Sequence, residues 1–152
     1  MALSKLDNLY RAVILDHSGH PHNQGVVELE DERVELNNPT CGDVISLTLK
    51  VDDDIITDIR FDGSGCSIST ASASMMTDSV LGKTRDEAYQ LANIFSQMVQ
   101  GETGEYDCLG EAQYLAGVSK FPQRIKCATL SWNALKKALE GKDSTSVNLS
   151  EH

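Results

Sequence analysis

Two neighbouring segments in which apolar and polar residues alternate constrain the fold of this chain most strongly. In the first, Ile45, Leu47, Leu49 and Val51 alternate with Val44, Ser46, Thr48 and Lys50; in the second, the alternating positions are Ile55, Thr57, Ile59 and Phe61. Asp52–Asp54 separates the two segments and is suited to a turn. Alternation with period two is typical of half-buried strands, so we expect a β-hairpin with one face toward solvent.

Helical patterns dominate the rest of the chain. We expect helices from Ser4 to just before Gly19, after Cys66, from a capping box at Thr84–Glu87 to Gly101, and from Pro122 to about Glu140. Between them we expect a short edge strand at 26–29, a loop at 101–111 and a short helical piece at 112–115. Strands come early and helices late, which predicts an α+β fold: a small antiparallel sheet of about three strands with helices packed on one face.

Length and composition fit one compact domain. The chain has 152 residues, of which 40% are hydrophobic, and this is enough for one core but too little for two. We expect a single domain over residues 1–140. The polar segment 141–152 predicts a flexible tail.

The charge balance excludes several classes of partner. A formal net charge of -10 repels nucleic-acid phosphates and anionic lipid. Charged residues interrupt the first 17 positions, so this segment is neither a signal peptide nor a membrane span. We expect a cytoplasmic protein that binds neither nucleic acid nor membrane.

Four cysteines lie far apart, and no two of them form a CxxC pair. In the reducing cytoplasm, cysteines more often bind metal or act in catalysis than form disulfides. Cys41 and Asp43 flank Gly42 where a turn leads into the first hairpin strand. Residues i and i+2 of a strand point the same way, so both side chains can serve one site. Alternatively, Asn, Pro, Gly and Asp are only turn formers and the thiol is incidental.

Cys66 and Cys127 lie near the beginnings of two predicted helices. Cys66 follows a Gly-Ser-Gly turn, where the helix dipole would stabilise a thiolate; the alternative is a small buried cap. Cys127 faces away from the predicted apolar stripe of its helix, although a lone helical cysteine is commonly inert and buried. Arg124 and Lys126 place positive charge in a first turn, where an anion or partner should compensate.

Cys41, Asp43, Cys66 and Cys127 together match the number and type of ligands that zinc accepts in a tetrahedral site. We interpret Cys108, which lies in an acidic segment, as a free surface thiol. His17, His20 and His22 form a rival cluster. His17 has the helical spacing of a core residue and the other two lie in a polar turn, so this cluster is the weaker metal candidate.

Three motifs together resemble iron–sulfur cluster assembly proteins of the IscU and NifU N-terminal family, especially its SufU branch. They are NNPTCGD (37–43), DGSGCSISTASASMM (62–76) and GVSKFPQRIKCATLSW (117–132). The resemblance extends from LYRAVILDH (9–17) through Leu139. It implies an IscU-like α+β fold, zinc ligands Cys41, Asp43, Cys66 and Cys127, and a cysteine desulfurase of the SufS type as partner.

One position departs from the IscU pattern. Members of the IscU type have a histidine directly before the third cysteine, where this chain has Lys126. The longer acidic segment before the last helix resembles SufU. These two differences favour sulfur relay over cluster building.

The leading hypothesis is a zinc-dependent, sulfurtransferase-like relay in which Cys41 accepts persulfide sulfur. A histidine of the desulfurase would release Cys41 from zinc, and Arg124 and Lys126 would serve docking or orientation. An alternative is a scaffold that binds iron, assembles a labile [2Fe-2S] cluster at the same ligands and transfers it to downstream acceptor proteins. A third possibility is a purely structural zinc. The chain has no HExxH or GxSxG motif, which disfavours a stand-alone hydrolase.

Overall fold

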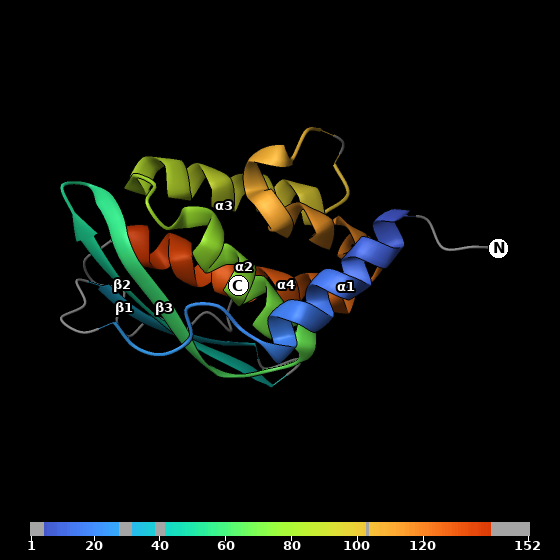
Figure 1. The fold of residues 1–152 in the computed structure, drawn as a ribbon, viewed down its shortest axis with the longest axis horizontal. Helices are drawn as coiled ribbons and strands as arrows, with labels where there is room; N and C mark the ends of the chain where they lie inside the picture. Colours follow the sequence, from blue (N-terminus) through green and yellow to red (C-terminus); the bar gives the residue numbers. More distant parts are fainter. Residues whose placement is uncertain (1–4, 28–31, 39–41, 103, 141–152) are drawn as a thin grey trace.

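The computed structural model describes residues 5–27, 32–38, 42–102 and 104–140. The elements in chain order are α1 (Lys5–Gly19), β1 (Glu32–Asn38), β2 (Asp43–Asp52), β3 (Ile55–Ser64), α2 (Ser67–Val80), α3 (Arg85–Val99), the 3-10 segment η1 (Asp107–Lys120) and α4 (Pro122–Glu140). The sheet is antiparallel in the order β1-β2-β3. The helices lie on one side of it (Figure 1), so the predicted α+β architecture is confirmed. The predicted tail lies outside the described residues.

The predicted hairpin is present, but its second strand does not alternate strictly. Asp53 and Asp54 both have positive φ, 55° and 67°, as a tight two-residue hairpin turn requires. The register shifts between Lys50 and Val51. This irregularity buries Ile56 and leaves Ile55 38% exposed, so the expected inward position of residue 55 was wrong. An extra residue in one strand reverses the faces of the residues that precede it.

The predicted edge strand at 26–29 is not present in the part that the structure describes: residues 26 and 27 are not in a strand, and positions 28–29 lie outside the described residues. The Val27 N–H donates to Thr48 Oγ1 at 2.9 Å instead of entering a ladder. Gly25 N–H donates to the Phe61 carbonyl at 2.7 Å. Thr48 is therefore buried although it lies on the predicted solvent face. The actual edge strand is β1, whose Val34 and Leu36 are buried.

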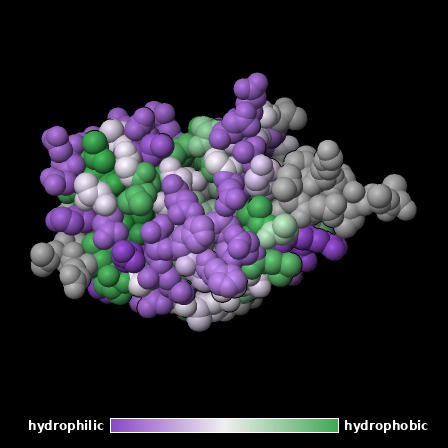
Figure 2. Space-filling model, viewed as in Figure 1, coloured by the Kyte–Doolittle hydropathy of each residue, from purple (hydrophilic) through white to green (hydrophobic). Residues whose placement is uncertain are grey.

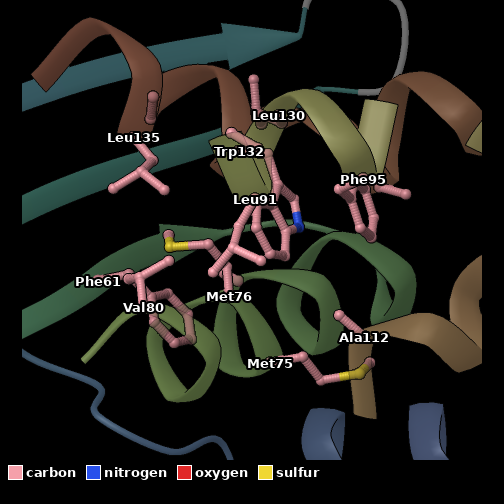
Figure 3. Close-up of a cluster of buried hydrophobic side chains, with 14 of the residues drawn as sticks. Phe61, Met75, Met76, Val80, Leu91, Phe95, Ala112, Leu130, Trp132 and Leu135 are labelled. Carbon is pink, nitrogen blue, oxygen red and sulfur yellow. The ribbon is translucent and has the colours of Figure 1, made fainter. Parts of the chain in front are cut away.

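Helix α4 lies between the sheet and the other helices and is buried on most sides (Figures 1 and 3). Trp132 stacks on Phe95 of α3 with ring centroids 4.5 Å apart. Its indole N–H donates to Ser72 Oγ of α2 at 3.1 Å, and Ser72 Oγ donates to the Ala128 carbonyl at 2.5 Å. These contacts fix α2 and α4 side by side. Cys127 is only 5% exposed but does not belong to the hydrophobic core cluster, so it is buried beside the main core.

The segment before α4 is more ordered than the sequence indicated. The expected loop at 101–111 gives way to η1 at Asp107, and Gly110 interrupts this element with φ 62° and ψ -137°. Leu109, Ala112, Leu115 and Val118 are its buried residues. They recur every third position, which is the period of a 3-10 helix. The α-helical period therefore predicts only the middle of η1, residues 112–115.

The capping box of α3 is confirmed, because Thr84 Oγ1 accepts the Glu87 N–H at 3.1 Å and Glu87 Oε1 accepts the Thr84 N–H at 3.0 Å. Hydrophilic side chains cover most of the face shown in Figure 2. Within the described residues, every helix is too short or too polar to span a bilayer.

Gly63, near the end of β3, marks the closest backbone approach beside the candidate site. Its φ is +132°, and a Cβ there would lie 2.2 Å from the Val44 carbonyl oxygen. Only glycine fits this position.

Candidate metal centre

Three of the four predicted zinc ligands converge at one end of the sheet. Asp43 is the first residue of β2, Cys66 precedes α2, and Cys127 lies in the second turn of α4. One ligand atom of each lies within 4.8 Å of the other two. Cys41, the fourth predicted ligand, lies outside the described residues.

Cys66 is the N-cap of α2, as its position in the sequence predicted. Its backbone is extended, with φ -73° and ψ 171°, and its Sγ accepts the Ser69 N–H at 3.4 Å. A thiolate here would receive this N–H and the positive end of the helix dipole. The thiol is free and exposed, so it is accessible to a metal or a partner.

Asp43 is a buried carboxylate, 1% exposed, with one oxygen already engaged. Oδ1 accepts the Cys66 N–H at 2.9 Å, whereas Oδ2 lies 4.0 Å from Cys66 Sγ. A hydrogen bond from a backbone N–H to a carboxylate orients the group firmly. Asp43 therefore presents its second oxygen toward the thiol.

Two glycines shape the site in different ways. Gly65 packs so closely that a Cβ there would lie 2.8 Å from Asp43 Oδ1 and 2.9 Å from Ser69 Oγ. Gly42 has open space around it but φ +75°. The position therefore favours glycine because of its backbone conformation, and not because a side chain would collide with a neighbour. The close packing of Gly65 against Asp43 and the hydrogen bond from the Ser69 N–H to Cys66 were not predicted.

Arg124 and Lys126, predicted to serve docking or orientation, are exposed in the first turns of α4. The Arg124 guanidinium lies 4.3 Å above the centre of the Phe121 ring, and Phe121 itself is 43% exposed. Cys108 is an exposed free thiol in η1 and does not belong to the group formed by Asp43, Cys66 and Cys127. His17 is buried, as its helical spacing predicted.

The donor set fits a zinc ion. Zinc accepts thiolate and carboxylate ligands, and the site offers two thiols and one carboxylate near the ends of β2, α2 and α4. A fourth ligand would complete a tetrahedron. Metal ligands in proteins are commonly oriented by a hydrogen bond from a neighbouring group. The bond from the Cys66 N–H to Asp43 Oδ1 is of this kind.

Comparison with known proteins gives consistent matches over most of the chain. The family model of the NifU-like N-terminal domain matches residues 9–140. A Streptococcus pyogenes serotype M1 protein named iron-sulfur cluster assembly scaffold protein IscU is 64% identical over 141 residues, which cover 92% of this chain and 88% of that protein. A Bacillus subtilis (strain 168) protein named zinc-dependent sulfurtransferase SufU is 55% identical over 139 residues, covering 90% and 92%.

Solved structures give the same fold. A crystal structure described as an iron-sulfur cluster assembly scaffold protein for the SUF system, from Fervidobacterium islandicum AW-1, is 33% identical with a TM-score of 0.82; it covers 87% of this chain and 97% of its own. A NifU-like N-terminal structure from Brucella abortus has a TM-score of 0.80 at 22% identity, covering 90% and 96%.

Proposed function

The chain belongs to the family of the NifU-like N-terminal domain, and from this premise we propose that it works in iron–sulfur cluster assembly as a zinc-dependent acceptor of sulfur from a cysteine desulfurase. The convergence of Asp43, Cys66 and Cys127 within 4.8 Å is the observation that carries the proposal. The name of the Bacillus subtilis relative, which is 55% identical, supports the sulfur-transfer role.

The proposed zinc ligands are Cys41, Asp43, Cys66 and Cys127. Bound zinc would keep the thiols deprotonated at neutral pH. Three of these residues are held in place: Asp43 by the Cys66 N–H, Cys66 by its capping position, and Cys127 by its burial. We assign the acceptor role to Cys41, because a histidine of the desulfurase that replaces it on zinc would release its thiolate while Asp43, Cys66 and Cys127 keep the metal.

The transfer is a thiol–persulfide exchange. The Cys41 thiolate attacks the outer sulfur of the persulfide on the desulfurase cysteine. The bond between the two persulfide sulfurs breaks, and the desulfurase cysteine leaves as a thiolate. Cys41 then carries the persulfide, so the exchange needs no external oxidant or reductant.

The exposed start of α4 is the proposed docking surface for a SufS-type desulfurase. Phe121 offers an apolar ring, and Arg124 and Lys126 add positive charge beside it to a chain whose net charge is -10. A partner with an acidic, partly apolar surface would fit here, because complementary charge steers association.

A matched pair of cysteine variants tests the proposal. Cys41→Ala should keep its fold and fail to stimulate turnover of a SufS-type desulfurase on cysteine, whereas Cys108→Ala should stimulate it like the wild type. Mass spectrometry of the wild type after the reaction should find one added sulfur atom on Cys41. Full stimulation by Cys41→Ala would show that Cys41 is not the acceptor.

A second candidate function is a scaffold on which a [2Fe-2S] cluster is assembled and passed to acceptor proteins. The name of the Streptococcus pyogenes relative, which is 64% identical, favours it. A hard carboxylate among soft thiolates also suits a cluster that must leave. Anaerobic incubation with iron and sulfide distinguishes the two. A scaffold forms a stoichiometric cluster that moves to an apo-ferredoxin, whereas a relay protein retains zinc.

A further inference from the structure

A second group of metal-binding side chains lies at the end of α1. His17 is fully buried there, and both of its ring nitrogens have partners: Nδ1 lies 2.7 Å from Ser74 Oγ of α2, and Nε2 lies 2.6 Å from Glu111 Oε1 of η1. The ring therefore joins three helical elements and has a fixed orientation.

His22, in the turn after α1, is more exposed but also has partners for its ring and its backbone. Its Nδ1 lies 2.5 Å from Asp78 Oδ2, and its backbone N–H donates to Ser74 Oγ at 2.8 Å. The Asn23 amide donates to the other Asp78 oxygen at 3.1 Å. The ring centroids of His17 and His22 are 4.5 Å apart. A carboxylate on Nδ1 holds that nitrogen in its protonated form and leaves the Nε2 lone pair of His22 for a ligand.

We propose that Asp16, His17 and His22 form a binding site for a divalent transition-metal ion, separate from the cysteine centre. One ligand atom of each lies within 4.8 Å of the other two. Two imidazoles and one carboxylate are the donors of non-haem Fe(II) sites, and they also suit zinc when a fourth ligand is added. The cysteine centre offers sulfur donors, so the two sites differ in chemistry.

The surroundings of the three ligands favour a cation. Asp78 and Glu111, the carboxylates that orient the two histidines, also line a cavity of about 270 Å³ together with Asp107, Cys108 and Lys83. Three carboxylates outweigh one ammonium group in its wall, so the cavity attracts cations. None of the three proposed ligands lines this cavity; His17 and His22 meet its wall through their contacts with Glu111 and Asp78.

Binding requires one rearrangement. Because both nitrogens of His17 have partners, one of these hydrogen bonds opens when a metal binds. The Glu111 side chain is 59% exposed, so it can rotate away from His17 or become a further ligand itself. When Nε2 is the ligating atom, the Ser74 contact to Nδ1 remains and keeps the ring in place.

Metal stoichiometry of the full chain tests the site. We expect the wild type to bind two equivalents of Co²⁺ under anaerobic conditions. One should show thiolate-to-cobalt charge-transfer bands and the other only ligand-field bands. His22→Ala should lose the second equivalent alone. The control is His20→Ala, which alters an exposed histidine of the same turn outside the cluster. This variant should keep both equivalents.

Two further variants separate the site from folding and from the cysteine centre. Asp78→Asn removes the carboxylate that orients His22 and should lower the affinity for the second metal equivalent by roughly 10–100-fold. Cys66→Ser should weaken the charge-transfer bands, because one of the proposed thiolate ligands is lost, and should leave binding of the second equivalent unchanged, whatever becomes of sulfur transfer. A wild type that binds one equivalent, or a second equivalent that persists in His22→Ala, would overturn the proposal.

Discussion

Replacing Gly65 by alanine tests whether the fixed Asp43 carboxylate governs metal affinity. The added Cβ would lie 2.8 Å from Asp43 Oδ1, 3.2 Å from Asp43 Cγ and 2.9 Å from Ser69 Oγ. Ordinary contacts begin near 3.4 Å, so the carboxylate must move by roughly 0.6 Å, the difference between 3.4 and 2.8 Å. Gly65 does not have positive φ, so the effect is steric and not a matter of backbone strain.

The displacement weakens the bond from the Cys66 N–H to Asp43 Oδ1, which is 2.9 Å long. A hydrogen bond to a charged group contributes about 1.5–3 kcal/mol. Loss of an outer hydrogen bond to a metal ligand typically lowers metal affinity by about 10–100-fold. We therefore expect Gly65→Ala to bind zinc between one and two orders of magnitude more weakly.

Competition with a chromophoric chelator measures this affinity directly. Gly19→Ala is the control, because a Cβ at Gly19 meets nothing within 4 Å and the position lies in α1, outside the cysteine centre. Its zinc affinity should equal that of the wild type. If Gly65→Ala also binds zinc within about twofold of the wild type while it remains folded, the reasoning about Asp43 is refuted.

Two buried serines and one tyrosine give further predictions. Ser72→Ala removes the hydroxyl that accepts the Trp132 indole N–H and should lower the free energy of unfolding by about 1–3 kcal/mol in urea denaturation. Ser131→Ala should leave stability unchanged or raise it, because the Ser131 hydroxyl has no hydrogen-bond partner within the described part of the chain; a loss as large as that of Ser72→Ala would contradict this. Burial, and then the hydrogen bond and charge of Glu140, raise the pKa of Tyr89 above 10.0. Stability should therefore fall as the pH rises above 10, since the unfolded chain ionises first, and Tyr89→Phe should show a smaller fall in alkaline urea titrations.

The elements that could be predicted are those whose signals lie within one segment. The hairpin alternation, the Thr84 capping box and the cap position of Cys66 needed no knowledge of the rest of the fold. Prediction failed where a contact between segments distant in sequence decides whether a residue is buried or which element it forms. Thr48 is buried because the segment before β1 covers it, and the residues near 26 bond to that side chain instead of forming a strand.

The candidate site divides in the same way. The residue types of Asp43, Cys66 and Cys127 suggested ligands, and their convergence is confirmed for these three residues. The bond that fixes Asp43 could not be foreseen, because it joins the first residue of β2 to the start of α2. The apolar stripe of α4 did not show how far Cys127 is buried, since the sheet and several helices surround α4.

The crowding at Gly63 has a consequence for large-scale mutagenesis. With a carbonyl oxygen 2.2 Å from any added Cβ, every substitution there must separate β2 from β3 next to the site. A saturation screen scored by growth would rank Gly63 with the metal ligands, although it contributes no donor atom. Measuring protein abundance alongside growth would tell them apart: Gly63 variants should be depleted in both, whereas variants of a zinc ligand that still fold should be depleted in growth alone.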